Sequence, residues 1–209
     1  MDKPRKTQTK ATRVRGYELT CVDNMAFDEL SSSLFKMMRQ NREKSACWAA
    51  YLLHTSGYYR YVWKRLLIFT SEDIGNANPM AITVIMSLKQ SYDFCIDSKN
   101  RQSITAYTIL FQAVTYLCRS MKTREADSLA TLIDTEYNNG KRIEIEDWTK
   151  DPHTEYGKQK YGKWDDGTPE ERKERYRMWV EVWSKATDEL TLLDRYMPKL
   201  RQLWELDDE

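Results

Sequence analysis

The segment from residue 157 to residue 163 carries the residue types of a phosphate-binding loop. Its two glycines and Lys163 fit the pattern GxxxxGK, in which backbone amides and a lysine surround phosphates. The pattern fails at the next position, because Trp164 stands where a serine or threonine would hold a magnesium ion. The flanking residues 151–153 and 165–167 are polar and do not resemble a buried strand and a helix. We therefore expect no nucleotide hydrolysis at this segment.

The same segment could instead bind single-stranded nucleic acid. Cations bind phosphates, and flat rings stack on exposed bases. The candidate contact residues are Lys158, Lys160, Tyr161, Lys163 and Trp164. A solvated basic loop whose aromatic side chains anchor it to the rest of the protein explains the pattern equally well. Both interpretations stay open at this point.

Other groups that could catalyse a reaction or bind a metal are too widely spaced. The chain contains four cysteines, none of them in a CxxC pair, and only two histidines. Zinc sites need such ligands at short spacing, and no nucleophile motif stands beside either histidine. These residues are Cys21, Cys47, Cys95, Cys118, His54 and His153. We expect no metal, no cofactor and no catalytic residue, so the chain is predicted not to be an enzyme.

The composition indicates a folded protein of the cytoplasm. Of the 209 residues, 41% are hydrophobic and 31% are charged, and the net charge is +1, a balance typical of globular domains. No apolar run approaches the roughly 20 residues that cross a membrane, and the polar start, residues 1–15, does not resemble a signal peptide. The expected location is the cytoplasm, or the nucleoid if the protein binds DNA.

Residues 1–24 are predicted to form a flexible basic arm. Within residues 1–15 six basic residues face the single acid Asp2, which gives a local charge of +5. Such an arm could touch the phosphates of nucleic acid. An arm without a role explains the composition equally well.

Residues 25–139 are predicted to form a compact all-α domain. Apolar residues recur at spacings of three and four, and the seven glycines and five prolines are too few for many short strands. Asn78 followed by Pro79 is typical of a helix start, with asparagine as the cap and proline at the first position. Six helices are expected, at about residues 28–39, 41–57, 59–71, 78–94, 103–119 and 124–137. Short connections between them predict a bundle, in which Ile104 and Phe111 lie on a buried face of the fifth helix.

Two further segments follow this domain. Residues 140–168 hold four of the seven glycines and no sustained period, which predicts an irregular loop or wing rich in lysine and aromatic residues. From residue 169 to residue 209 a heptad pattern indicates a long helix, for which Thr168 is a suitable N-cap. Its apolar stripe includes Trp179, Trp183, Leu190, Leu193 and Leu200. The stripe could pack within the chain or pair with a second copy, and Pro198 is expected to kink the helix or split it into a pair.

The stretch from residue 61 to residue 79 resembles the signature of a known family. It contains a basic helix, then the sequence SEDIG at residues 71–75, and it ends at Pro79. This is similar to the replication-associated recombination protein A family, also called MgsA, whose eukaryotic relative is the Werner-helicase-interacting ATPase. Residues 27–34 and 46–53 resemble the family's two preceding helical segments. The resemblance covers residues 25–165.

The resemblance implies a helical collar, related to that of clamp loaders, which joins subunits into a tetramer. In that family separate N-terminal modules hydrolyse ATP, and the 24 residues before the matching part are too few for a P-loop, a Walker B acid or an arginine finger. The expected function is a non-catalytic oligomerisation or scaffold subunit in DNA replication, recombination or repair. Its expected partners are further copies of itself and a separate AAA+ ATPase, with no membrane. A direct DNA-binding accessory protein is the alternative.

The residues of the family signature are expected to be scaffold rather than a binding site. They are Ser71, Glu72, Asp73, Ile74, Gly75 and Pro79. Asp73 and Asn78 could satisfy amides at helix ends, and Gly75 permits a turn with positive φ. The basic residues of the preceding helix are Arg60, Lys64 and Arg65. They could contact DNA phosphates or the acids of a neighbouring subunit, or face solvent.

Overall fold

The computed structural model describes residues 19–97, 99–184, 197–204 and 206. The chain divides into two units, residues 1–140 and 141–209, and we describe each by itself. Both units are helical, and within the described residues β pairing is limited to one isolated bridge between Thr20 and Ala26. The prediction of an all-α fold is therefore confirmed.

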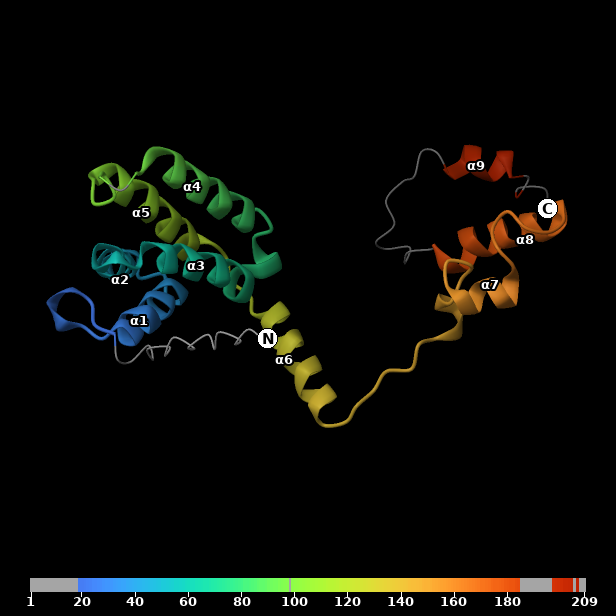
Figure 1. Ribbon diagram of the computed structural model, residues 1–209, viewed down its shortest axis with the longest axis horizontal. Coiled ribbons are helices and arrows are strands. Elements are labelled where there is room, and N and C mark those ends of the chain that lie inside the picture. The colour runs from blue at the N-terminus through green and yellow to red at the C-terminus, as the bar shows by residue number, and fades with distance from the viewer. Residues whose placement is uncertain (1–18, 98, 185–196, 205, 207–209) are drawn as a thin grey trace, which may run out of the picture. The chain divides into compact units, whose positions relative to one another are not determined.

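The first unit contains a bundle of five α-helices and a sixth helix beside it (Figure 1). Their positions agree with the sequence periodicity within a few residues. The helices are α1 (Phe27–Arg39), α2 (Glu43–Leu53), α3 (Tyr59–Phe69), α4 (Ala81–Cys95), α5 (Ile104–Arg119) and α6 (Glu125–Asn138). A π-helical turn, η3 (His54–Tyr58), links α2 to α3, and Gly57 within it has a φ of 90°. A second π-helical turn, η4 (Thr70–Ile74), follows α3.

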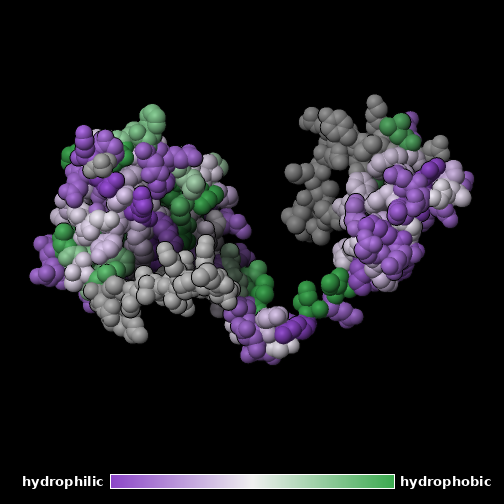
Figure 2. All heavy atoms as spheres, viewed as in Figure 1, coloured by the Kyte–Doolittle hydropathy of each residue, from purple (hydrophilic) through white to green (hydrophobic). Residues whose placement is uncertain are grey.

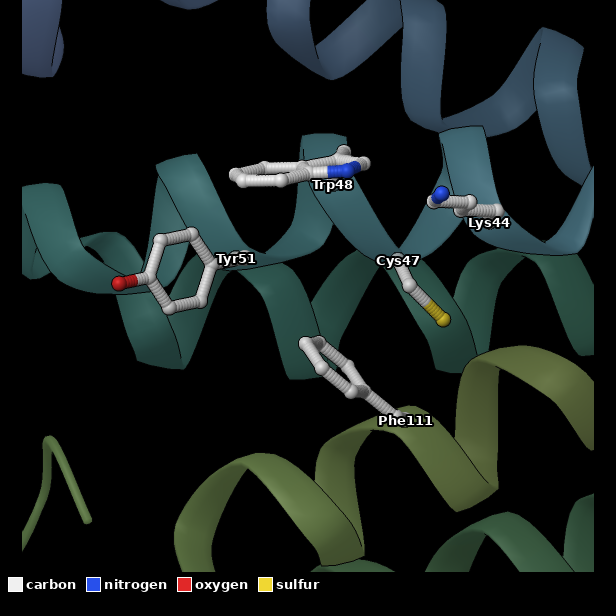
Figure 3. A pocket seen from close by; sticks show the side chains of 5 residues that line it. All are labelled: Lys44, Cys47, Trp48, Tyr51 and Phe111. Atoms are coloured by element: carbon white, nitrogen blue, oxygen red, sulfur yellow. The ribbon is translucent and has the colours of Figure 1, made fainter. Parts of the chain in front are cut away.

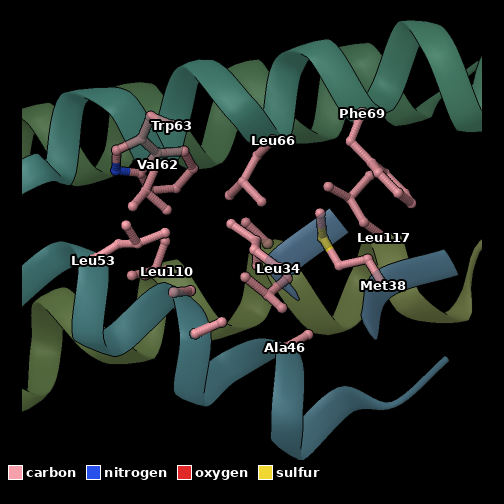
Figure 4. Close-up of a cluster of buried hydrophobic side chains, with 14 of the residues drawn as sticks. Leu34, Met38, Ala46, Leu53, Val62, Trp63, Leu66, Phe69, Leu110 and Leu117 are labelled. Carbon is pink, nitrogen blue, oxygen red and sulfur yellow. The ribbon is translucent and has the colours of Figure 1, made fainter. Parts of the chain in front are cut away.

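Apolar side chains from α1, α2, α3 and α5 meet in the core of this bundle (Figure 4). Leu34, Leu53, Leu66 and Leu117 are completely buried, and Trp63 is almost so. Each leucine stabilises the fold by about 1.5–3 kcal/mol relative to an exposed position. On α2 the buried residues include three alanines, at positions 46, 49 and 50. These small side chains allow α1 and α5 to pack closely against α2.

The buried face of α5 agrees only in part with the predicted apolar face, of which Val114 and Leu117 are completely buried. The helix buries Ala106, Leu110, Ala113, Val114 and Leu117, together with Cys118, rather than its bulkiest residues. Ile104, which was expected in the core, is 80% exposed. The physical reason is that alanine positions allow the α5 backbone to approach α2, which turns the larger Phe111 side chain toward the edge of the contact.

The expectation that all six helices share one compact bundle is wrong for α6. This helix packs against η4 and buries none of its residues. Figure 1 shows it extending from the bundle, and Figure 2 shows apolar side chains on its surface. Of the described helices, none is long and apolar enough to cross a membrane.

His54 is buried at the end of α2, where its Nε2 lies 2.7 Å from the hydroxyl oxygen of Tyr92. Burial, assisted by the positive charge of Arg101, lowers the pKa of His54 from 6.5 to about 4. Between these two values the unfolded chain binds more protons than the folded chain. The contribution of neutral His54 to the free energy of unfolding is therefore fully present above pH 6.5, and it is lost as the pH falls toward 4.

This pKa shift predicts that the first unit loses about 2 kcal/mol of stability between pH 7.5 and pH 5 through His54 alone. Urea unfolding of the wild-type chain and of His54→Gln at both pH values isolates the contribution of His54, because the two proteins contain the same carboxylates. His153→Gln, at an exposed histidine of the second unit, is the control and should keep the full pH effect. An equal pH effect in His54→Gln would mean that His54 is not held neutral.

The second unit contains three described α-helices: α7 (Glu155–Tyr161), α8 (Pro169–Met178) and α9 (Met197–Leu203). Two short turns, η6 (Asp147–Thr149) and η7 (Trp179–Trp183), precede α7 and follow α8. The expectation that residues 140–168 are wholly irregular is corrected, because α7 lies within them. Thr154 caps α7, since its side chain accepts a hydrogen bond from the amide of Gly157.

The start of α8 has the cap that the sequence predicts. Thr168 and Glu171 form a reciprocal capping box, with Pro169 at the first position of the helix. The helix is shorter than the heptad pattern suggests, because it ends at Met178 and continues only as η7. Pro198 lies in the first turn of α9, where a missing amide breaks no helical hydrogen bond. Leu190 and Leu193 of the predicted stripe lie outside the described residues.

Candidate functional site

The family-like signature contains an ion pair that links η4 to α1, in which the carboxylate is buried and the Arg39 side chain is 35% exposed. Asp73 is 1% exposed. Its carboxylate accepts hydrogen bonds from Arg39, from Nε to Oδ1 at 2.5 Å and from Nη2 to Oδ2 at 3.1 Å. Paired bonds of this kind fix both distance and orientation. The Asp73 side chain thus binds Arg39, the last residue of α1. The expectation that it satisfies an amide at a helix end is corrected.

The rest of the signature positions the segment that leads to α6. The carbonyl oxygen of Asp73 accepts a hydrogen bond from the amide of Thr123 at 2.9 Å. Gly75 has a φ of 47° and a ψ of −135°, a conformation that residues with a side chain rarely adopt. Ile74 is completely buried, whereas Ser71 is exposed and Glu72 is half-buried. These contacts describe a structural joint between the bundle and α6.

Asn78 does not cap α4, contrary to the expectation. The helix begins at Ala81, after Met80, and Pro79 precedes it as an exposed residue. The side-chain amide of Asn78 instead donates hydrogen bonds to Tyr116 Oη at 3.0 Å and to Ser120 Oγ at 3.1 Å. Asn78 therefore ties the start of α4 to the end of α5, a contact that no local sequence pattern indicates.

The three basic residues of α3 occupy different surroundings. Arg65 lies over the ring of Phe35, with its Cζ 3.6 Å from the ring centre, so it contributes to packing on α1. Lys64 is exposed, and Arg60 is exposed with its Cζ 5.8 Å from the ring of Tyr59. Of these three residues, only Arg60 and Lys64 present their charges to solvent.

The GxxxxGK segment forms α7 and the turn that ends it, which is not the geometry of a phosphate-binding loop. Gly157 lies inside the helix, where a Cβ atom would stand 1.8 Å from the carbonyl oxygen of Asp151. Gly162 ends the helix with a φ of 81°. Gly157 thus permits close packing of α7 on residue 151, and Gly162 ends the helix. Lys163 follows the helix end instead of preceding a helix.

Two of the three lysines in this segment are bound to acids. Lys158 contacts Glu155 at 2.6 Å, and Lys160 contacts Asp147 at 2.6 Å. The hydrogen bond with Asp147 holds the pKa of Lys160 above its ordinary value. Lys163 is exposed. The predicted basic surface of the segment is therefore partly neutralised within the second unit.

The predicted base-stacking aromatics pack against other aromatic side chains of the second unit. The Trp164 ring lies 5.7 Å from Trp183 and 6.1 Å from Tyr176, and the Tyr161 ring lies 5.5 Å from Trp183. Trp179 contacts Trp204, with 5.9 Å between the ring centres. Trp179 and Trp183 of the predicted stripe thus have partners within their own unit. Leu200 belongs to α9.

Two surfaces of the first unit were not predicted from the sequence. One is the apolar face of α6, and the other is a cavity of about 380 Å³ between α2 and α5. Lys44, Cys47, Trp48, Tyr51 and Phe111 line this cavity (Figure 3). Burial raises the pKa of Cys47 to about 11, so its thiol is neutral and acts as a small apolar group.

A comparison with known families assigns the chain. The model described as "MgsA AAA+ ATPase C terminal" matches residues 41–170, which are 130 of the 209 residues. The chain belongs to this MgsA C-terminal family. The matched region extends from the start of α2 to the start of α8, so it includes the SEDIG signature, α6 and α7. No curated protein matches the chain.

Membership in the MgsA C-terminal family relates the chain to the helical part of these AAA+ ATPases that lies outside the ATPase module. Arg39 precedes the matched region, yet it forms the ion pair with Asp73 inside it. The signal for the α6 surface was present in the sequence as Leu129, Leu132 and Ile133, at helical spacing. An apolar face at helical spacing ordinarily predicts burial, whereas in this helix Leu129, Leu132 and Ile133 are exposed.

Proposed function

We propose that the chain is a non-catalytic helical subunit that oligomerises and associates with an AAA+ ATPase of DNA replication, recombination or repair. Family membership supports the link to an ATPase. The exposed apolar face of α6 carries the proposal of assembly: Leu129, Leu132 and Ile133 are 54%, 53% and 57% exposed. Apolar side chains grouped on one face of a helix usually pack against a partner.

The energetic case rests on the length and surface of α6. A helix of 14 residues is marginal in water without tertiary contacts, so packing must stabilise it. Burying three large aliphatic side chains contributes about 1.5–3 kcal/mol each. Association also costs translational and rotational freedom. A stable assembly therefore needs a complementary surface in addition to α6 itself.

The experiment that tests the ATPase link mixes the full chain with an AAA+ ATPase that carries the same C-terminal region. Sedimentation velocity should show a complex heavier than either protein alone, because like helical regions associate. The same ATPase truncated before its C-terminal region is the control and should not bind. If the full-length ATPase leaves the sedimentation of the chain unchanged, the proposed association is wrong.

Direct DNA binding remains the alternative, and the exposed cations of α3 are the observation that favours it. Arg60 and Lys64 are exposed, and the guanidinium groups of Arg60 and Arg101 lie 5.8 Å and 3.9 Å from the centre of the Tyr59 ring. Removing a phosphate contact lowers the salt dependence of single-strand affinity by about 0.7 in log–log slope. Arg60→Gln/Lys64→Gln removes two cations and should lower the slope by about 1.4, and Lys158→Gln/Lys160→Gln should lower it less. Absent or salt-independent binding rejects this alternative.

A further inference from the structure

The apolar face of α6 is exposed in the same unit that carries the cavity between α2 and α5. Leu129, Leu132 and Ile133 lie at positions i, i+3 and i+4, so they share one side of the helix. Within its own chain α6 packs against η4, at the joint around Asp73 and Thr123. Because the three side chains are exposed in this arrangement, α6 does not fill the cavity of its own chain.

The cavity has the chemistry to accept aliphatic side chains. Trp48 and Tyr51 form one wall, with their rings 5.7 Å apart in an edge-to-face contact, and Phe111 faces them from α5 (Figure 3). Trp48 is 56% exposed, so a large part of its ring is accessible to a partner. Exposed tryptophan and tyrosine beside a hollow are typical anchors of protein interfaces.

The charges of the two surfaces are complementary. Between Glu125 and Asn138, α6 contains four acidic residues and no basic residue, and Arg124 at its N-cap pairs with one of them, Asp127. The cavity lining contains the exposed cation Lys44 and no acid. Two α6 helices packed against each other would bring their acids together, which costs free energy. An acidic, apolar helix therefore fits the cavity better than it fits another α6.

We propose that α6 of one copy docks through Leu129, Leu132 and Ile133 into the α2/α5 cavity of a second copy. This inference rests on the proposed role in assembly and names the two surfaces that form it. The binding mode is that of an amphipathic helix in an apolar groove. Each copy contributes one helix and one cavity, so the contact is heterologous and can repeat until a ring closes.

The test uses full-length chains that carry a defect in one surface only. The helix variant is Leu132→Glu/Ile133→Glu, and the cavity variant is Trp48→Glu. All three side chains are more than half exposed, so the substitutions leave the core intact. Phe94→Glu, at a 93% exposed position on α4, is the matched control for adding a charge. Far-UV circular dichroism of each variant verifies its fold.

Native mass by light scattering is the readout. We expect the wild-type chain and Phe94→Glu to assemble, and each surface variant alone to have the mass of one chain. An equimolar mixture of the helix and cavity variants should form a dimer, because the intact cavity of one accepts the intact helix of the other. A mixture that stays monomeric would overturn the heterologous contact.

Two other outcomes separate this inference from the proposed function. If both surface variants assemble as the wild-type chain does, the α6 contact is wrong while the assembly role stands. If the wild-type chain has the mass of one chain at every concentration, the assembly role itself is wrong, and the contact falls with it.

Discussion

Replacing Arg39 by alanine is expected to lower the free energy of unfolding of the first unit by about 3 kcal/mol. The Asp73 carboxylate is 1% exposed, and both of its oxygens accept hydrogen bonds from Arg39. Without the guanidinium the buried carboxylate loses both of its hydrogen-bond donors, and such a charge destabilises a fold strongly. Urea unfolding followed by far-UV circular dichroism measures the loss.

The matched control is Arg119→Ala, because Arg119 binds Glu43 with the same forked geometry. Its Nε and Nη2 lie 2.7 Å and 2.9 Å from the two carboxylate oxygens. The Arg119 side chain is 71% exposed, so water replaces the lost contact and stability should change little. Replacing both members of the buried pair, as Arg39→Met/Asp73→Leu, should recover much of the loss. Equal effects at Arg39 and Arg119 would contradict the role assigned to burial.

Gly157→Ala is expected to destabilise the second unit by about 3 kcal/mol, the upper end of the usual cost of overpacking. A Cβ atom at residue 157 would lie 1.8 Å from the carbonyl oxygen and 2.2 Å from the carbonyl carbon of Asp151. These are backbone atoms, so α7 must move away from the preceding turn. Tryptophan fluorescence reports this unfolding well, because five of the seven tryptophans lie in the second unit.

The control for this substitution is Gly140→Ala, which adds a methyl group where nothing lies within 4 Å. The positive φ of 88° at Gly140 still disfavours alanine, by about 1 kcal/mol. Because Gly140 is the last residue of the first unit, its substitution should leave the tryptophan signal of the second unit unchanged. If Gly157→Ala unfolds at the wild-type urea concentration, the close packing of α7 on residue 151 is not real.

The helices of the first unit were largely predictable because their signals are local. Apolar spacing placed α1, α2 and α3 within a few residues, and Thr168 as an N-cap before Pro169 marked the start of α8. The orientation of α5 was not predictable in the same way. Side-chain size suggested that Ile104 and Phe111 face the core, whereas the alanines set the distance between α5 and α2.

The contacts of the candidate site depend on residues far apart in the sequence. Asp73 and Arg39 are 34 positions apart, and Asn78 and Ser120 are 42 positions apart. A single sequence contains no pattern that pairs them. The SEDIG signature was correctly linked to the MgsA family by resemblance, but its physical role as a joint to α6 required the structure.

The native mass of the full chain in solution is the measurement that tests the proposed assembly role most directly. Sedimentation equilibrium at two protein concentrations should give a mass above that of one chain, rising with concentration toward four chains, as the resemblance implies. This result is expected because the exposed side chains Leu129, Leu132 and Ile133 need a partner. The mass of a single chain at both concentrations would contradict the account.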